Sequence, residues 1–600
     1  MASQPDLASS KDGVTKQTNG VAYTNGNSHY NVPAETLKVF QEGILGNPRI
    51  ARFLPEEALS GQVPVHFTGS SDPSLPINWR EAESVAALKA LEATLVNVIL
   101  NRKYNLDPQT VTINTDHAIL FIFSCILWSI DPDGANVSLN GSLAPGTKGV
   151  DQHFPSGDTH RLFASLYRGV SSNLYRCADG KFFQLHSSLD PDGPLKSIDL
   201  PLDRDVGSYE EAIQIYMDAV GKIPSDELQH RTSDIYKHAG QVCLSSEEFW
   251  NSEHGKANQH VDLFEIHDIP NERQPACWWP ATSQTSPSRP LAGLKVVDLT
   301  RIIAGPTIGR GLAELGASVM RVKAPHLPDY GVLHPDLNWG KWNCHIDLRE
   351  EEGRERLRAL ILDADVVLNG YRPNVLAKYG FGEQQVIELC NSRERGIIYA
   401  RENCYGWNGP WRNRSGWQQI SDAVTGVAVS FGRALGLEEP VLPVFPNSDY
   451  CTGIAGICGV LIAIVRRGER GGSYLVDIAL NYYNQWLIRS VGTYPDKVFE
   501  KMRREAPGEV YRHYHTTGYT YPRMLNSLLN GQCRERLFKA EFFEDRPADV
   551  AIGKGKVMRC VKPVISFDSG IVKPGYHIGT RRNGVDAPKW PEDLTVQQVA

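Results

Sequence analysis

The alternation of apolar and polar positions changes sharply near residue 290. Residues 294–300 form an apolar run with the length of a buried strand, and residues 306–316 follow with apolar side chains at helical spacing. The alternation continues with predicted strands at 318–322, 365–369, 396–401 and 474–479, and with predicted helices at 351–364, 384–391 and 452–465. Strands that alternate with helices at this spacing predict an α/β fold with a doubly wound, Rossmann-like parallel sheet. Such sheets bind ligands beyond the carboxyl ends of their strands.

A helix–turn–strand unit occurs twice along the chain. A predicted amphipathic helix at 84–102 leads into an apolar segment at 111–113, as the helix at 452–465 leads into the strand at 474–479. In an ungapped register Ser84 falls opposite Asp449, so that the first copy lacks the carboxylate of the second. The alternative is a chance likeness of two amphipathic helices.

Composition narrows the classes of partner and compartment. The 600 residues exceed one hydrophobic core, and a net charge of -7 gives no basic surface for nucleic acid. The most apolar run, 118–130, is too short to span a bilayer, so we expect no membrane partner. The eleven cysteines are scattered without a C-x-x-C pair. That spacing predicts reduced thiols, no metal site and a cytoplasmic location.

Asp449 is the first candidate for chemistry. It follows Asn447 and Ser448 where the apolar helix begins, and all three residue types favour helix N-caps. On chemistry alone, Asp449 is therefore interpreted as a helix cap.

The chain from residue 290 to about residue 485 resembles the family III CoA-transferases, also called the CaiB/BaiF family. Seven ordered segments carry the likeness: PLAGLKVVDLTRIIAGP (290–306), LAELGASVMRVKAP (312–325), NWGKWNCHIDL (338–348), RPNVLAKYGFG (372–382), GWNGPWRNRSGW (406–417), the helix after Asp449, and RRGERGGSYLVDIAL (466–480). The resemblance implies that Asp449 is a nucleophile that attacks an acyl-CoA thioester and then carries CoA as an aspartyl thioester. A helix N-terminus would hold this carboxylate ionised and can stabilise an oxyanion.

Position within these segments also implies a coenzyme-binding set. The residues that fall at the family's coenzyme-contacting positions are Ile303, Ala304, Arg349, Gly370, Tyr371, Lys378 and Arg414. The chain departs from the family pattern at Lys323-Ala324, where an acidic residue is usual, and at Gly370, where Asn is usual.

Three activities remain open at this point. The resemblance favours an acyl-CoA:carboxylate CoA-transferase that uses an acyl-CoA thioester and a small carboxylic acid, with CoA as substrate and no tightly bound cofactor. A racemase of this family uses a His where this chain has Trp417, which cannot shuttle a proton. The third possibility is an inactive CoA-binding pseudoenzyme.

The resemblance also predicts how the chain is divided. We expect a disordered tail at 1–35, a degenerate first copy with a small α+β domain at 36–281, a linker at 282–290, a CoA-binding catalytic domain at 291–490 and a C-terminal wrap at 491–600. Family members are interlocked homodimers, so a pseudo-duplicated chain is expected to be either a homodimer or a pseudo-dimeric monomer.

Overall fold

The computed structural model describes residues 30–139, 149–506 and 508–600. Residues 1–29 of the predicted tail lie outside the described residues. Helix α1, Val32–Lys38, is capped by the Asn31 side chain, which accepts a hydrogen bond from the backbone N–H of Ala34. Helix α1 thus lies across the boundary predicted at residue 35.

A seven-stranded sheet forms the centre of the larger part of the molecule. Its strands, in spatial order, are β11 (Lys341–His345), β10 (Ser318–Lys323), β9 (Lys295–Leu299), β12 (Val366–Asn369), β13 (Ile398–Asn403), β14 (Ser473–Ala479) and β8 (Phe264–Ile269). All neighbours pair in parallel except β8, which runs antiparallel to β14. The prediction of an α/β fold with a large, mostly parallel sheet is confirmed. From β9 the chain adds strands first on one side of the sheet, as β10 and β11, and then on the other, as β12 and β13. Open sheets of this kind bind ligands at the switch point between the two sides, here between β9 and β12.

Helices cover both faces of this sheet. Val296 packs in one core with Ile308 of α12 (Ala304–Glu314), whereas its neighbour Val297 packs in a second core with Leu357 of α14 (Glu351–Asp363). Successive side chains of a strand point to opposite faces, so continuous apolar strands are the expected consequence.

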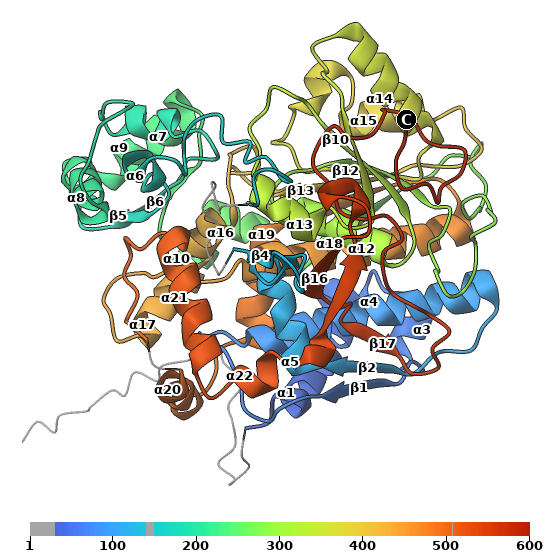
Figure 1. Cartoon of the computed structure of the whole chain (residues 1–600), viewed down its shortest axis with the longest axis horizontal. Helices are drawn as coiled ribbons and strands as arrows, with labels where there is room; N and C mark the ends of the chain where they lie inside the picture. The colour runs from blue at the N-terminus through green and yellow to red at the C-terminus, as the bar shows by residue number, and fades with distance from the viewer. Residues whose placement is uncertain (1–29, 140–148, 507) are drawn as a thin grey trace, which may run out of the picture.

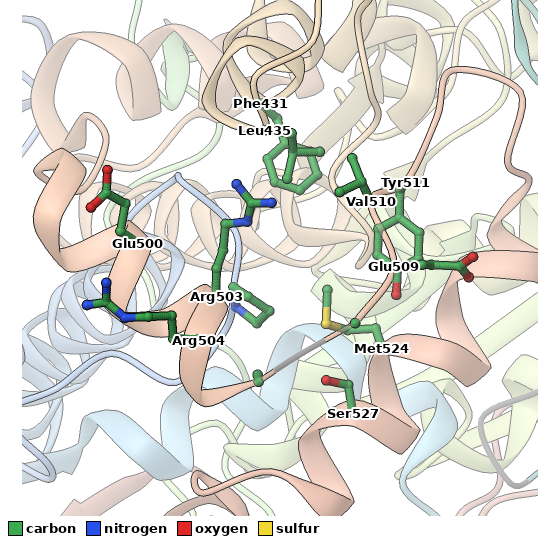
Figure 2. Close-up of a pocket in the computed structure, with 13 residues that line it drawn as sticks. Phe431, Leu435, Glu500, Arg503, Arg504, Glu509, Val510, Tyr511, Met524 and Ser527 are labelled. Carbon is green, nitrogen blue, oxygen red and sulfur yellow. The ribbon is translucent and has the colours of Figure 1, made fainter.

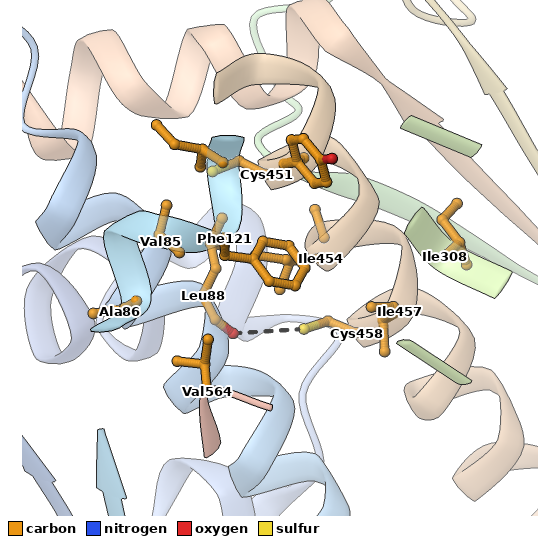
Figure 3. Packing of buried hydrophobic residues seen from close by; sticks show 14 of the residues in the cluster. Val85, Ala86, Leu88, Phe121, Ile308, Cys451, Ile454, Ile457, Cys458 and Val564 are labelled. Atoms are coloured by element: carbon orange, nitrogen blue, oxygen red, sulfur yellow. Dashed lines mark hydrogen bonds between the residues drawn. The ribbon is translucent and has the colours of Figure 1, made fainter. Parts of the chain in front are cut away.

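The central helix of the first face is α18, Asn447–Arg470. Within the described residues it is the helix long and apolar enough to cross a membrane, but 94% of its most apolar window is buried inside the protein. It packs against α12 so closely that a Cβ on Gly311 would lie 2.1 Å from Ile457 Cδ1. On its other side lies α4, Glu81–Tyr104, where Cys458 Sγ approaches the Leu88 carbonyl oxygen at 4.0 Å (Figure 3).

A smaller body lies beside the sheet domain, at the upper left of Figure 1. This small domain, residues 166–242, contains an antiparallel sheet of β5 (Leu174–Arg176), β6 (Phe182–Leu185) and β7 (Gly240–Val242). It has a separate apolar core around Tyr175, Phe183 and Tyr216. The small domain therefore folds around its own interior and presents one side to the sheet domain.

The first copy keeps a remnant of a sheet. Strand β2 (Val111–Asn114), which follows α4, pairs in parallel with β1 (Val65–Thr68) and antiparallel with β17 (Ile565–Phe567). Strand β14, which follows α18, likewise pairs in parallel with β13 and antiparallel with β8. In each helix–strand unit the strand therefore has one parallel and one antiparallel neighbour.

The local geometry shifts the register between the two helices by one residue, although the ends of β2 and β14 keep the ungapped register. Arg80 before α4 has φ -79° and ψ 64°, and Pro446 before α18 has φ -78° and ψ 54°. The next backbone N–H donates back two residues in each case, from Glu81 to the Trp79 carbonyl at 2.9 Å and from Asn447 to the Phe445 carbonyl at 2.8 Å.

Both helices contain 24 residues, and Asp449 is the third of α18 as Glu83 is the third of α4. The prediction that Ser84 is its counterpart is wrong. A carboxylate is therefore present in the first copy as well. The predicted amphipathic pattern of α4 also differs from the structure, because every residue from Glu81 to Leu100 is buried.

The edge strands of the two sheets are exchanged along the chain. Strand β8 precedes residues 282–290 but completes the sheet of the second unit, and β17 comes from the predicted wrap but completes the sheet of the first. The two units are interlocked by these strands.

A buried ion pair ties β9 to β11 behind helix α12. Lys341 Nζ lies 2.8 Å from Asp298 Oδ2 and donates to the Pro306 carbonyl at 2.8 Å, with both charged side chains fully buried. Burial lowers the pKa of Lys341 to about 8, although Asp298 opposes that change. This contact fixes the first turn of α12, which borders the site.

Candidate functional site

Asp449 lies in the first turn of α18 and is not a helix cap. The N-cap position is taken by Pro446. Within the described residues the Asp449 carboxylate has no hydrogen-bonding or ion-pairing partner. The capping interpretation of Asp449 is therefore wrong, and its side chain is available to a ligand.

Two further carboxyl groups lie close to Asp449 in the structure. Burial raises the pKa of Glu402, on β13, to about 7. Asp422, on α16 (Gln418–Thr425), accepts hydrogen bonds from Asn484 at 2.9 Å, from Ser448 at 3.1 Å and from Gln418. Burial raises the pKa of Asp422 to about 6, although these three donors oppose the rise.

This neighbourhood changes the expected protonation of Asp449. Burial raises the pKa of Asp449 well above its ordinary value, and the charges of Glu402 and Asp422 raise it further. Desolvation and the two like charges act on the Asp449 carboxylate in the opposite direction to the helix dipole, which favours the ionised form.

A cavity of about 480 Å³ lies where the strand order reverses; we call it the switch-point cavity. It is lined by residues that follow the carboxyl ends of β9, β11 and β12, including Arg301, Asp347 and Gly370. Asp449 and Glu402 line its inner end. Five of the sequence-predicted coenzyme residues lie in this lining: Ile303, Ala304, Arg349, Gly370 and Tyr371.

The two other predicted coenzyme residues lie elsewhere. Lys378 is exposed on a short helical turn, Leu376–Tyr379, next to residues that line the switch-point cavity. Arg414 donates to Gln241 Oε1 at 3.2 Å and lies over the Trp411 ring. The structure does not bring these two side chains together with the other five.

Sequence reasoning missed the most available cations of this cavity. Arg301, Arg372 and Lys237 line it and form no ion pair with a carboxylate in the described part of the chain. The predicted Arg349, by contrast, forms a two-point contact with Asp347, at 3.0 Å and 2.6 Å. Arg301 lies in the family segment 290–306, directly after the first strand, so the sequence could have indicated that it lines the site. Lys237 belongs to the small domain and lies in none of the family segments, so no motif indicated its position.

A second cavity, of about 490 Å³, opens on the other side of Asp449; we call it the small-domain cavity. Its walls come from the small domain and the residues just before it, from the start of α12, and from α21 (Thr517–Asn530). Ile302, Ile303, Trp417 and Asp449 line both cavities. Asp449 therefore stands at the junction of two chambers.

Two residues of the small domain, His186 and Ser188, contact Trp417 beside this junction. The His186 ring stacks on the indole of Trp417 with 5.4 Å between ring centroids, and the indole N–H donates to Ser188 Oγ at 2.7 Å. His186 Nδ1 accepts from the Ser188 backbone N–H at 3.0 Å, so its Nε2 carries the proton and donates to Gln419 Oε1 at 3.1 Å. Burial lowers the pKa of His186 to about 4. This neutral imidazole has both nitrogens engaged and is not a free base.

The carboxylate equivalent to Asp449 in the first unit is sealed. Glu83 is fully buried and accepts hydrogen bonds from Tyr494 at 2.8 Å, from Arg80 at 3.5 Å and from Tyr30. A cavity lined by Trp79, Glu81 and Tyr494, close to it in the chain, holds about 10 Å³. The Glu83 carboxylate is thus engaged by three side chains, whereas Asp449 lines two cavities of about 480 and 490 Å³.

A third cavity and a cluster of metal-ligating residue types lie apart from Asp449. A third cavity of about 390 Å³ lies between α17 (Val427–Ala434), α20 (Asp496–Glu505) and α21; Figure 2 shows Arg503 reaching from α20 towards Phe431 and Leu435. It contains none of the predicted site residues. Glu265, His267 and Asp477 lie within metal-ligating reach of one another, but Arg401 already contacts Asp477 at 2.6 Å.

Comparisons with known proteins agree with the resemblance. The sequence model of CoA-transferase family III matches residues 291–520. The chain is 47% identical over 566 residues to acetyl-coenzyme A transferase nodX of Hypoxylon pulicicidum, with 94% of each chain covered. It is 32% identical over 485 residues to an acyl-CoA transferase of Gibberella moniliformis, covering 78% of this chain and 81% of that one.

Among solved structures, a CaiB/BaiF family protein from Brucella suis is 28% identical, with 33% of this chain and 55% of that chain covered and a TM-score of 0.29. The family assignment rests on the similarity to acetyl-coenzyme A transferase nodX, which extends over 94% of both chains. The chain belongs to CoA-transferase family III and is a CoA-transferase of that family.

Proposed function

We propose that the protein transfers CoA from an acyl-CoA donor to a carboxylic acid through a thioester on Asp449. The observation that carries this proposal is the position of the unpartnered Asp449 carboxylate where the switch-point and small-domain cavities meet. The similarity to acetyl-coenzyme A transferase nodX suggests acetyl-CoA as the donor.

The proposed reaction balances without an added reagent. Ionised Asp449 attacks the thioester carbon, a C–O bond forms, the C–S bond breaks, and CoA leaves as a thiolate. The thiolate attacks the Asp449 carbonyl carbon of the anhydride, which releases the donor acid as a carboxylate. The acceptor carboxylate then attacks the Asp449 thioester and expels the thiolate, which takes the acceptor acyl group and frees Asp449.

The coenzyme is proposed to lie in the switch-point cavity. Its phosphates would be met by Arg301, Arg372 and Lys237, whose charges no carboxylate of the described residues offsets. Backbone at Ile303 and Gly370 follows two adjacent strand ends, so it allows close approach of the pantetheine arm towards Asp449.

Hydroxylamine trapping tests the mechanism. With acetyl-CoA present, hydroxylamine should displace CoA from the Asp449 thioester and leave a hydroxamate, located by peptide mass spectrometry. Asp449→Ala should form none and lose CoA exchange. Full exchange activity in Asp449→Ala would overturn the mechanism. Racemisation is less supported at the family's histidine position, because Trp417 cannot accept a proton and both nitrogens of the neighbouring His186 are engaged.

We further propose that the active form is a single chain. The small domain covers the site of its own chain, and the exchange of β8 and β17 interlocks the two units as partners would be interlocked in a dimer. Light scattering should give a mass near 66.6 kDa for the active protein. A mass of twice that value, with activity lost on dilution, would contradict a pseudo-dimeric monomer.

A further inference from the structure

The small-domain cavity is larger and more apolar than a small acid needs. At about 490 Å³ it lies within the roughly 300–1,000 Å³ of pockets that enclose a drug-sized ligand. Aliphatic and aromatic side chains make up much of its wall, among them Leu162, Phe163, Leu166, Val170, Leu333 and Tyr521. An acetate or propanoate would leave most of this surface uncovered.

The aromatic wall of the cavity is rigidly held. The Phe163 ring stacks on the Tyr330 ring with 4.2 Å between centroids, and Tyr330 is buried. Leu166, on the short helix Leu166–Gly169, also lines the cavity and keeps 52% of its surface exposed. An exposed leucine facing a preformed cavity provides apolar area that a ligand can bury.

The charges around the cavity exclude a second acidic group on the ligand. Apart from Asp449, the charged side chains in the lining are Glu210 and Arg523. Arg523 is paired with Glu509 at 2.8 Å and lies over the Tyr519 ring at 3.5 Å. No cation in the described lining is left to bind the distal carboxylate of a dicarboxylic acid.

We infer that the acceptor is a large, apolar monocarboxylic acid whose hydrocarbon or aromatic body fills the small-domain cavity while its carboxylate meets Asp449. This inference rests on the proposed function and names its acceptor class, in place of the small acid expected from sequence. The coenzyme enters from the switch-point cavity, so donor and acceptor approach Asp449 from opposite sides.

The test compares four acceptors with acetyl-CoA as donor: octanoate, 3-phenylpropanoate, propanoate and succinate. The measurement is kcat/KM for each acid, from the acyl-CoA product separated by chromatography. Octanoate and 3-phenylpropanoate should exceed propanoate by about a hundredfold or more, since each buried methylene improves transition-state binding. Succinate should be the poorest acceptor.

A variant that fills the small-domain cavity tests whether this cavity causes the preference for large apolar acids. Leu166→Trp should lower kcat/KM for octanoate by about tenfold or more and lower kcat/KM for propanoate much less, because the shorter acid needs less of the cavity. Thr517→Trp fills the cavity from the opposite wall and should act in the same direction if Leu166→Trp does not fold. Leu362→Trp is the matched control, because Leu362 is 41% exposed on α14 and lines neither cavity.

The outcomes separate this inference from the proposed function. A preference of the wild type for propanoate or succinate overturns the inference and leaves CoA transfer intact. Equal slowing of all acids in both filled variants also overturns it. Absence of CoA exchange with every acid, together with no hydroxamate at Asp449, removes the proposed function itself.

Discussion

Glu83 occupies in α4 the position that Asp449 occupies in α18. Both are third residues of 24-residue helices that begin with the same backbone turn. Their surroundings differ: three side chains donate to Glu83, whereas Asp449 has no partner among the described residues and lines two cavities. One carboxylate is held by hydrogen bonds inside the fold, and the other lines two cavities.

The pair predicts opposite effects of substitution. Glu83→Ala removes the acceptor of Tyr494, Arg80 and Tyr30 and should lower the free energy of unfolding by roughly 2–4 kcal/mol, because buried donors are left unsatisfied. It should still form one hydroxamate per chain, at Asp449. Asp449→Ala should unfold at or above the wild-type temperature and form none. Calorimetry and peptide mapping measure the two effects; a hydroxamate on Glu83 would contradict them.

Glu402 should control the acid limb of the pH profile. Only ionised Asp449 attacks the thioester, and its pKa is raised, so kcat/KM for acetyl-CoA should fall as pH drops below that raised pKa. Glu402→Gln removes a neighbouring negative charge, lowers the pKa of Asp449, and should move the acid limb about one unit to lower pH.

The matched control is Glu355→Gln, on the exposed side of α14. Its pH profile should coincide with that of the wild type. An acid limb that stays in place in Glu402→Gln would show that Glu402 does not act on Asp449.

The unpaired cations should bind coenzyme more strongly than the predicted arginine does. Arg301→Ala and Lys237→Ala should each raise the KM for acetyl-CoA by about tenfold or more, the usual effect of losing a hydrogen bond to a charged group. Arg349→Ala should have a smaller effect, because Asp347 already offsets its charge. Repeating the kinetics with 3′-dephospho-CoA esters identifies the residue at the 3′-phosphate; equal KM changes at all three positions would refute the ranking.

The buried Lys341–Asp298 pair should be strongly coupled. Lys341→Met leaves the Asp298 charge unpaired and should lower the free energy of unfolding by about 3–5 kcal/mol. The double variant Lys341→Met with Asp298→Leu should recover much of that loss, because no buried charge remains. Chemical denaturation of the wild type, Lys341→Met, Asp298→Leu and the double variant gives the coupling, and additive losses would argue against it.

The sequence predicted the sheet of the second unit because each strand is a continuous apolar run followed by a helical period. The predicted strand at 294–300 differs from β9 by one residue at each end. The pairing of strands that are distant in sequence could not be predicted from local patterns. Nothing near Phe264 or Ile565 indicates that β8 and β17 are exchanged between the two units.

The candidate site was predicted only in part, for physical reasons. Family segments located Asp449 and five residues of the switch-point cavity. The register error at Ser84 arose because the ends of β2 and β14 fit the ungapped register, whereas the starts of α4 and α18 are offset from it by one residue. Glu402 was missed because a single acidic residue in a strand carries no pattern; its raised pKa depends on burial beside Asp449.

The exchange of edge strands sets an order on folding during synthesis. Strand β8 leaves the ribosome long before β14, the strand with which it pairs, begins at Ser473. The separation in sequence is larger still between β2 and β17, which begins at Ile565. Pairings of such sequence separation form late, and an unpaired edge is a template for association with other chains. A nascent chain that stops before Ile565 keeps an open edge at β2. Interrupted synthesis therefore yields an aggregation-prone fragment, although the whole family segment at 291–520 has already been made.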